Sequence, residues 1–267
     1  VVRTVTAGTL IEETLLDRKK NNFLLALIEI HSKYAIAWLD MSTGDLQTQT
    51  ISEGSITAAL ARVDPGEILI SEKLLINQKI SETLEPWAKF FTILPSSSFD
   101  SANGNLRLQN LYKVKTMDAY GNFTRAELAA AGALIDYLHL TQKGRVPRIA
   151  PPKQVVDGSV LEIDAATRRN LELTQTLVGE RKGSLLALLD QTVTAAGGRL
   201  FSKQLASPLT DVDVINYRLD MVQFFYEDHK ILGLLKNCLL KMPDIERALS
   251  RISMARGGPR DLATIRD

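Results

Sequence analysis

The chain has 267 residues, of which 45% are hydrophobic and 24% are charged, and its formal net charge at pH 7 is +1. This composition predicts a globular protein with one large or two ordinary domains, and the small net charge is far below the basic excess of a typical nucleic-acid-binding domain. No apolar run approaches the roughly 20 residues that span a bilayer, and the single cysteine, Cys238, excludes an internal disulfide, so we expect a cytoplasmic chain.

The first 51 residues predict a short helix followed by three strands. Thr9 and Glu12 have the spacing of a capping box, which favours a helix over residues 9–17. Apolar, β-branched and aromatic residues then predict strands over residues 23–30, 34–40 and 46–51. Because the turns between these strands are short, we expect an antiparallel meander.

From residue 55 onward, helical and strand patterns alternate. The expected elements are a helix over 55–63, a strand over 67–71, a helix over 72–87 and a strand over 90–94. Repeated strand–helix–strand units favour parallel pairing through crossover helices. Two further helices are expected over 99–112 and 124–142, and Thr124 with Glu127 forms the capping box of the second. Residues 10–143 are therefore predicted to form one α/β domain.

The rest of the chain is predicted to be helical after an extended linker. Three prolines favour an extended segment over residues 144–156 that crosses between domains. Helical patterns follow over 164–177, 183–191, 194–206, 211–226, 230–240 and 243–254. Residues 157–267 are therefore expected to form an all-α, incomplete helical bundle. The chain lacks an initial methionine and stops soon after Pro259, which starts another helix, so we expect a fragment of a longer protein.

A glycine pair lies inside the helix expected over 194–206. Apolar residues keep helical spacing on both sides of Gly197 and Gly198. Glycine in a helix interior costs roughly 1 kcal/mol relative to alanine, so the pair needs a compensating close contact. We expect that contact to be a helix–helix crossing.

Short motifs along nearly the whole chain resemble those of one family. They are RxVTAGTL at 3–10, WLDMSTGDL at 38–46, IDAATRRNLEL at 163–173, GSLL, LD, T-x-T, GGRL and PL within 183–211, DIER at 244–247, Arg251, and GPRDL at 258–262. With these motifs at these spacings, the chain resembles the MutS family of DNA mismatch-recognition ATPases. It departs from the family at Ala7, Ala196 and Gln204, where proline, methionine and tryptophan are common, and these departures affect the expected local packing.

This resemblance implies both a fold and a role. It implies that residues 1–9 link to a missing N-terminal mismatch-binding domain, that 10–143 form a connector domain with a ribonuclease H-like mixed sheet, and that 157–267 begin the lever-forming core. Mismatched DNA, ATP and magnesium would be bound by other parts of a homodimeric protein. The fragment would then be non-catalytic and free of cofactors, would transmit ATP-state changes, and would offer a surface to MutL. No residue is assigned to the MutL or DNA surface.

Two alternative functions stay open. Asp40 and Asp45 flank a hairpin in a domain resembling ribonuclease H-like folds, in which carboxylates can hold two metals that activate water. This arrangement indicates a metal-dependent nuclease. However, Asp45 lies in a turn, where aspartate is common, and Glu53, Asp64 and Glu67 lie in or near other turns. The second alternative is an interaction module unrelated to mismatch repair.

Side chains that serve as nucleophiles or metal ligands in other proteins are scattered. His31, His139 and His229 are far apart, and none has a second ligand at metal spacing. We expect His139 to be a packed or half-exposed helix residue. Cys238 lies among leucines and is expected in the core. No catalytic, cofactor-binding or metal-binding residue is therefore predicted.

Three further patterns have structural interpretations. Residues 179–184 resemble a phosphate loop, but the spacing is wrong and a helix precedes them where a strand is needed. The aromatic run 224–226 lacks the interleaved basic residues of a base-stacking surface, so we expect two of its rings to face a core and one a neighbour. The densest basic region is interpreted as a solvated linker and helix start. Its members are Arg145, Arg148, Lys153, Arg168 and Arg169.

Overall fold

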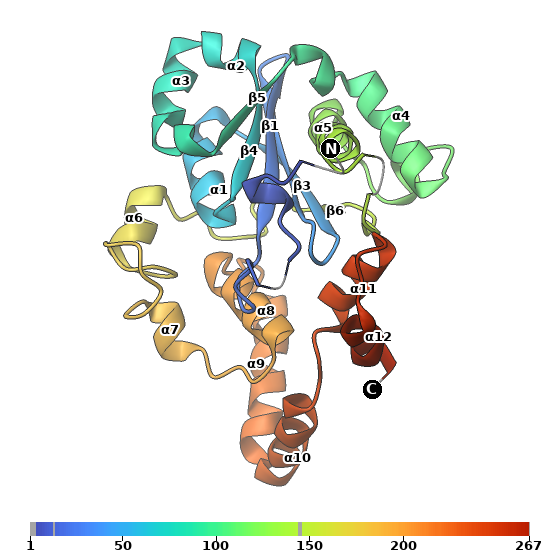
Figure 1. Cartoon of the computed structure of the whole chain (residues 1–267). Helices are drawn as coiled ribbons and strands as arrows, with labels where there is room; N and C mark the ends of the chain where they lie inside the picture. The colour runs from blue at the N-terminus through green and yellow to red at the C-terminus, as the bar shows by residue number, and fades with distance from the viewer. Residues whose placement is uncertain (1–3, 13, 144–145, 267) are drawn as a thin grey trace.

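The computed structural model describes residues 4–12, 14–143 and 146–266, and it places a mixed sheet between two layers of helices, with more helices beyond one end of the sheet (Figure 1). Within these residues, six strands form one sheet in the order β5-β4-β1-β2-β3-β6. They are β1 (Phe23–Ile30), β2 (Lys33–Asp40), β3 (Asp45–Ile51), β4 (Glu67–Ser71), β5 (Phe91–Leu94) and β6 (Lys153–Gln154). The predicted fold class, an α/β domain followed by a helical domain, is confirmed.

The strand pairing follows the predicted topology. β1, β2 and β3 form an antiparallel meander, in which Phe23 lies opposite Asp40. β4 pairs parallel to β1 and β5 pairs parallel to β4, as the crossover prediction requires. The extended segment after residue 146 adds β6, which pairs parallel to β3 with Lys153 opposite Gln47. This segment is therefore tied to the sheet edge as well as leading to the helices.

Helices cover both faces of the sheet. They are α1 (Ile56–Val63), α2 (Glu72–Ile76), α3 (Gln78–Leu84), α4 (Ser101–Tyr112) and α5 (Arg125–Thr141), together with 3-10 segments at Ala7–Thr9, Glu53–Ser55, Glu85–Phe90, Ser96–Phe99 and Met117–Ala119. α4 and α5 lie on one face, and α1 to α3 on the other (Figure 1). Because strand side chains alternate between faces, Leu24 and Ala26 belong to the core under α5, whereas Leu25 and Leu27 belong to the core under α1.

The tightest helix crossing joins α4 to α5 through two glycines. A Cβ on Gly132 would collide with the backbone of Gly104, and a Cβ on Gly104 would lie 2.6 Å from the carbonyl oxygen of Leu128. Only glycine lets the two backbones approach this closely. Thr124 caps α5 with Glu127 in the predicted capping box. The asparagines around Gly104 therefore do not interrupt α4, because the glycine between them is where α5 packs.

Two helix predictions in this domain are wrong. Among the described residues of 9–17, Thr9 ends a 3-10 segment and the others form irregular structure with one turn, while residue 13 lies outside the described part of the chain. The Thr9 side chain folds back to accept a hydrogen bond from the Thr6 backbone nitrogen at 2.9 Å, which stabilises the short 3-10 segment that Thr9 ends. The helix over 72–87 is broken into three pieces. Asn77 ends α2 in an extended conformation and caps α3, and α3 passes at Glu85 into a 3-10 segment that has a proline in its first turn.

The helical region follows the sheet domain. Its elements are α6 (Ala165–Asn170), α7 (Leu185–Leu189), α8 (Ala195–Ala206), α9 (Val212–Glu227), α10 (His229–Leu240), α11 (Ile245–Ser253) and α12 (Pro259–Arg266). The predicted helices are present, although the one over 164–177 ends at Asn170, where Glu172 adopts a φ of +47°. Among the helices described, none has the length and apolarity to cross a bilayer.

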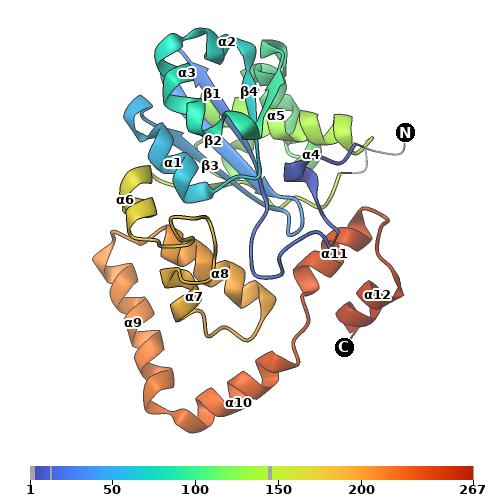
Figure 2. The same ribbon diagram turned by 60° about the vertical axis from the view of Figure 1, so that its left-hand side comes forward.

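α9 and α10 project away from the sheet and return to α11, and we call this pair the arm (Figure 2). Neither arm helix contains a buried residue. Many of their large apolar side chains are exposed, for example Leu219, Val222 and Leu234. The described part of the helical region therefore forms an open arrangement, not a closed bundle.

Candidate functional site at the junction of sheet and helices

Arg247 on α11 fastens the helical region to the sheet. Its side chain is 3% exposed. Nη1 donates to the carbonyl oxygen of Asp17 at 2.9 Å, and Nη2 donates to that of Lys20 at 2.7 Å. Nε donates to Ser42 Oγ at 3.1 Å. The loop before β1 and the turn after β2 lie at the same end of the sheet, so one planar guanidinium holds α11 against both.

Asp40 is connected to Arg247 through the Ser42 side chain. It ends β2 and is fully buried. Its Oδ1 accepts hydrogen bonds from the backbone nitrogen of Ser42 at 2.8 Å and from Ser42 Oγ at 2.6 Å. Burial raises the pKa of Asp40, while the Ser42 bonds and the charge of Arg247 oppose that rise. Asp40 therefore orients the serine that receives Arg247.

The same face of α11 makes two more contacts with the sheet domain. Ser250, one turn after Arg247, donates from Oγ to the carbonyl oxygen of Met41 at 2.8 Å. Met254, after the end of the helix, is buried in the hydrophobic cluster between the sheet and α5. The spacing of Arg247, Ser250 and Met254 puts all three on one side of α11, so this helix docks as a unit.

Arg199 on α8 closes the base of the arm. It is buried, and its Nη1 and Nη2 bond the two carboxylate oxygens of Asp244 at 2.6 Å and 2.9 Å. Nη2 also reaches Glu246 at 3.0 Å, and Nη1 donates to the carbonyl oxygen of Arg18 at 3.1 Å. α8 precedes the arm in the chain and Asp244 follows it. This bidentate pair therefore joins the segment before the arm to the segment after it.

The electrostatics of this pair favour its charged form. Burial would raise the pKa of Asp244, but the hydrogen bonds and positive charge of Arg199 outweigh burial and hold that pKa below its usual range. Burial likewise opposes the charge on Arg199, and the two carboxylates overcome it and raise the pKa of Arg199. The pair is therefore a fixed ionic clamp at neutral pH.

Lys19 forms a third bridge between the loop before β1 and the helices. Its Nζ lies 3.2 Å from Asp190 and donates to the carbonyl oxygen of Thr192 at 2.8 Å. The aliphatic part of Lys19 lies across Gly198, where a Cβ would be 2.7 Å from Lys19 Cγ. The expectation of a helix–helix crossing at Gly197 and Gly198 is therefore wrong, because a lysine stem fills the space that Gly198 leaves.

Asp45 also belongs to this junction. Its Oδ2 lies 3.0 Å from the Nζ of Lys203 on α8 and accepts a hydrogen bond from Gln47 at 2.6 Å, and its Oδ1 lies 3.6 Å from Lys153 Nζ. Burial raises the pKa of Asp45, but Lys203 and the other partners lower it overall. Asp40 and Asp45, the pair that motivated the nuclease alternative, thus serve two different parts of the junction. In the described ranges, no group of three or more His, Cys, Asp or Glu could hold a metal ion.

Several expectations about single residues are corrected by the structure. Cys238 is exposed, not in a core, because nothing in the described chain covers α10. His139 is also exposed on α5, and not packed or half-exposed. Glu67, expected in or near a turn, directly follows the bend at Gly66, begins β4 as predicted, and is buried. There it accepts hydrogen bonds from Gly8 N, Thr92 Oγ1 and Tyr137 Oη at 2.9, 2.6 and 2.7 Å.

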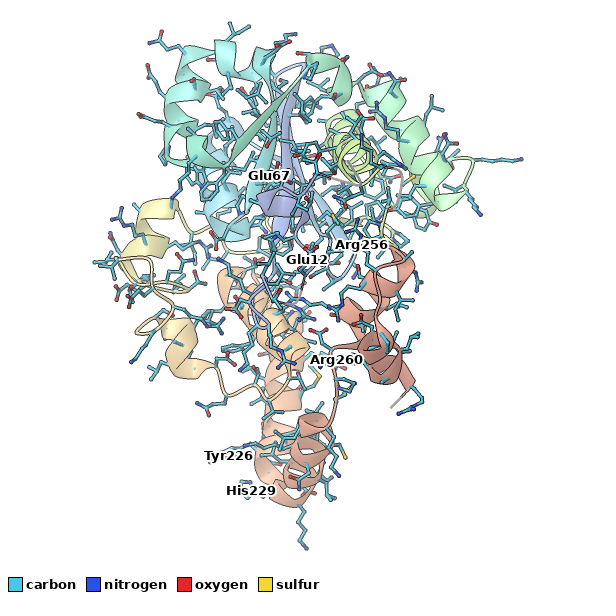
Figure 3. The ribbon with its side chains drawn as sticks, viewed as in Figure 1. Glu12, Glu67, Tyr226, His229, Arg256 and Arg260 are labelled. Atoms are coloured by element: carbon cyan, nitrogen blue, oxygen red, sulfur yellow. The ribbon has the colours of Figure 1, made fainter. Side chains whose placement is uncertain are left out.

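The aromatic run and the histidine beside it lie on the arm. Phe224 and Tyr226 are exposed and Phe225 is half-buried, so the expectation that two of these rings face a core is wrong. Tyr226 contacts His229 edge-to-face, with ring centroids 6.2 Å apart. Figure 3 shows both side chains at the end of the molecule farthest from the sheet, whereas Glu67 lies within the sheet. These aromatic residues are therefore remote from the junction.

The expected basic region divides into different environments. Arg148, Lys153 and Arg169 are exposed, which agrees with a solvated face, and Arg145 lies outside the described residues. Arg168, in contrast, is buried, so its assignment to a solvated helix start is wrong. Residues 179–184 form a loop from which Arg181 pairs with Asp190 at 2.7 Å.

Sequence reasoning missed the arginines of the junction. Arg199 and Arg247 were recognised only as parts of family-like motifs, because arginine is usually exposed and no local pattern marks a buried one. One signal was available: Arg247, Ser250 and Met254 share a helix face on which two polar residues stand where apolar ones are expected. A buried polar face of this kind indicates specific partners.

Comparison with known proteins agrees with this architecture. A family model for MutS domain II matches residues 22–150, and one for MutS domain III matches residues 166–267. The DNA mismatch repair protein MutS of Roseobacter denitrificans is 47% identical over 267 residues, which cover 100% of this chain and 30% of that protein. The MutS proteins of Ruegeria pomeroyi and Cereibacter sphaeroides are 46% identical over 271 residues and 45% identical over 266 residues, with the same coverage.

The chain thus spans 30% of the length of the curated relatives it matches. The alternative of an interaction module unrelated to repair is wrong, because both halves of the chain match the same family. The chain belongs to the MutS family of DNA mismatch repair proteins, and it contains that family's domains II and III, the connector and the core.

Proposed function

We propose that this chain is the non-catalytic coupling part of a mismatch repair ATPase. In this proposal residues 10–143 are the connector domain, 144–156 are the linker, 157–267 are the first part of the core, and 1–9 lead from a mismatch-binding domain. The whole protein binds mismatched double-stranded DNA and ATP with magnesium, and it acts as a cytoplasmic homodimer. Its coupling part transmits ATP-state changes to the DNA-binding end and offers a surface to MutL.

The observation that supports this proposal is the way in which Arg247 and Arg199 join α11 and α8 to the loops of the sheet. Each guanidinium is buried and bonds partners from more than one segment. Separating α11 from the sheet would break all three hydrogen bonds of Arg247, and each hydrogen bond to a charged group contributes about 1.5–3 kcal/mol. A displacement of the core helices therefore moves the sheet domain with them, and this mechanical role needs no catalytic group.

The coupling role can be tested in the full-length protein with Arg247→Met, which keeps most of the side-chain bulk and removes all three hydrogen bonds. We expect mismatch affinity to stay within about twofold, while ATP-triggered release from mismatched DNA slows about tenfold, which corresponds to a rise of about 1.4 kcal/mol in the barrier to release. Stopped-flow fluorescence of a labelled mismatched duplex measures both quantities.

The matched control is Arg251→Met, one turn further along α11. Arg251 is bonded to Asp261 on α12, with Nε 2.9 Å from Oδ1, and this pair lies within the helical region. Its loss should leave ATP-triggered release unchanged. Equal release rates for the Arg247 variant, the Arg251 variant and the parent protein, with all three folded, would contradict the coupling role.

The partner surface needs a separate test. Isothermal calorimetry of the chain against MutL from the same organism should give saturable binding, with MutL injected into buffer as the blank. Full-length protein with ATP is the second titration. If neither the chain nor the ATP-bound protein binds MutL, the partner proposal is wrong while the coupling proposal remains open to its own test.

A further inference from the structure

A cleft of about 400 Å³ lies where the sheet domain meets the helical region. Its walls come from the loop before β1, from β2 and α1, from the linker, and from α6, α8 and α9. Its lining contains more basic than acidic side chains. The basic ones are Lys20, Arg62, Arg168, Arg181, Lys203 and Arg218, and the acidic ones are Asp17 and Asp64. This volume lies in the range of small-molecule sites.

Three of these cations already have carboxylate partners. Lys20 pairs with Asp64 at 2.9 Å, Arg181 with Asp190 at 2.7 Å, and Lys203 with Asp45 at 3.0 Å. Their charges are therefore balanced within the protein. The excess charge in the cleft comes mainly from its other arginines, which have no ion-pair partner among the described residues.

Arg168 is the most unusual of these arginines. Its side chain is 6% exposed, and none of Nε, Nη1 and Nη2 has a hydrogen-bond partner among the described residues. A buried guanidinium has five N–H donors and keeps its charge, and leaving it unpaired is strongly unfavourable. Buried polar groups are normally satisfied by protein, water or an ion.

Arg62 places a second positive charge beside the first. It lies with its guanidinium carbon 5.4 Å from the centre of the Trp38 ring and donates to Gln49 Oε1, a neutral acceptor. Burial, and then the charge of Arg168, lower the pKa of Arg62 to about 10. Glu162 opposes that shift, but it is exposed and its Oε2 accepts from Ser55 Oγ at 3.0 Å.

Water does not neutralise these groups. Both arginines line the cleft, and a second hollow of about 10 Å³ also touches both. Water in these spaces can accept hydrogen bonds but carries no net charge. Two neighbouring guanidiniums instead match an anion with two negative charges and several oxygens, because their planar forks bind phosphate in bidentate fashion.

We propose that this cleft binds a phosphate group held by Arg168 and Arg62. The three Arg168 nitrogens are buried, so the Arg168 side chain turns towards the cleft when the dianion binds. The tetrahedral dianion then accepts hydrogen bonds from these free donors and reduces the repulsion between the two guanidiniums. Apolar lining residues, including Leu200 and Leu209, leave room for a small organic body attached to the phosphate. Because the cleft is walled by both domains, the bound group stabilises their contact. This inference is independent of the coupling role proposed above.

The test uses the whole 267-residue chain and inorganic phosphate, titrated at constant ionic strength against chloride. Isothermal calorimetry and the thermal unfolding midpoint report binding, and the Nε–Hε NMR signal of Arg168 reports its location. We expect saturable binding, a rising midpoint and a shifted Arg168 signal. Arg168→Gln should weaken phosphate binding at least tenfold and should not lower the midpoint in phosphate-free buffer, since it removes an uncompensated buried charge.

Arg169→Gln is the matched control, because it removes the same charge from the neighbouring, exposed position of α6. It should bind phosphate as the parent chain does. If Arg168→Gln fails to fold, Arg168→Lys keeps the charge without the planar fork and should still weaken binding at least threefold. Absence of saturable binding to the parent chain, or equal binding by the parent and either folded Arg168 variant, overturns the proposal.

A second arm distinguishes the source of the phosphate. Adenosine monophosphate is titrated in the same way as inorganic phosphate. Binding at least fivefold tighter than that of inorganic phosphate supports a phosphate ester whose organic body occupies the apolar part of the cleft. Comparable or weaker binding of the ester, together with saturable inorganic phosphate binding, supports free phosphate as the ligand.

Discussion

The sheet and the arm are similarly apolar in sequence, but they differ completely in packing. β1 has the sequence FLLALIEI and is buried over most of its length, because helices cover both faces of the sheet. α10 has the sequence HKILGLLKNCLL, yet none of its residues is buried. Local periodicity thus sets the conformation of a segment, whereas burial depends on what the chain supplies opposite it.

This contrast also separates two ways of holding an element in place. The sheet is stabilised by apolar area removed from water, at about 25 cal/mol per Å². α11 is fixed mainly by the polar contacts of Arg247 and Ser250 and by one buried methionine, Met254. The arm has neither kind of anchor along its length and is held at its base by Arg199. Substitutions of the same chemical type should therefore have unequal effects in the three regions.

The largest difference is expected for leucine truncation. Leu39→Ala empties a position that is 0% exposed in the core under α5, and it should lower the free energy of unfolding by about 3 kcal/mol. Leu234→Ala removes the same atoms from a side chain that is 68% exposed, and it should change that free energy by less than about 0.5 kcal/mol. Urea denaturation followed by circular dichroism measures both. Equal losses would show that the arm is packed against the rest of the chain.

Glycine-to-alanine changes should have opposite signs in the two regions. Gly132→Ala drives a methyl group into the backbone of Gly104 and should destabilise the sheet domain by about 2 kcal/mol. At Gly233 on α10 nothing lies within 4 Å of an added Cβ, so Gly233→Ala should stabilise that helix by up to about 1 kcal/mol. Amide hydrogen exchange resolves the two helices separately. Destabilisation of α10 by the second substitution would contradict its open surroundings.

The clamp at the base of the arm should be sensitive to pH. Because the folded-state pKa of Asp244 is lowered, its contribution to stability is complete above the unfolded-state pKa, about 3.9, and is lost as pH falls through the folded-state value. Asp244→Asn should cost about 2 kcal/mol at pH 7 and progressively less in acid. Urea titrations at several pH values measure this convergence. Asp220→Asn, on the exposed surface of α9, is the control and should have little effect.

The smallest effect is expected at the cysteine. Cys238→Ser should change the free energy of unfolding by less than about 0.5 kcal/mol, because the side chain is exposed on α10. For the same reason, the thiol should react with a disulfide reagent in the folded chain at a rate within about tenfold of its rate in urea. Strong protection of the thiol would indicate a cover over the arm, for example a second copy of the chain.

Most of the fold was predictable from the sequence, because strand alternation and helical spacing are local signals. The meander, the parallel crossovers and the capping box at Thr124 followed from such patterns. The two wrong helix predictions reflect local hydrogen bonds at Thr9 and Asn77. The other failures have one physical source, which is that packing partners are not encoded locally. Gly198 meets a lysine stem instead of a helix, Cys238 has nothing opposite it, and Arg168 is buried although its neighbour Arg169 is exposed.

The candidate site was less predictable than the fold. Asp40 and Asp45 were identified as an unusual pair, but Lys203, the partner of Asp45, is 158 residues away in the chain. Ser42, the partner of Asp40, in turn bonds Arg247, which is 205 residues beyond that serine. A carboxylate at the end of a strand gives no indication of whether a metal or an arginine faces it. Only the folded arrangement distinguishes the two.

Two of the bonds made by Arg247 end on backbone oxygens, those of Asp17 and Lys20. A carbonyl oxygen is present whatever residue occupies the position, so these attachments do not depend on the identity of the side chains in that loop. Substitutions that keep the loop conformation should leave them intact, and a random library at 17 and 20 should retain many folded members. The attachment is thus robust to mutation on one side and vulnerable on the other, where a change at a single codon, that of Arg247, removes every bond at once.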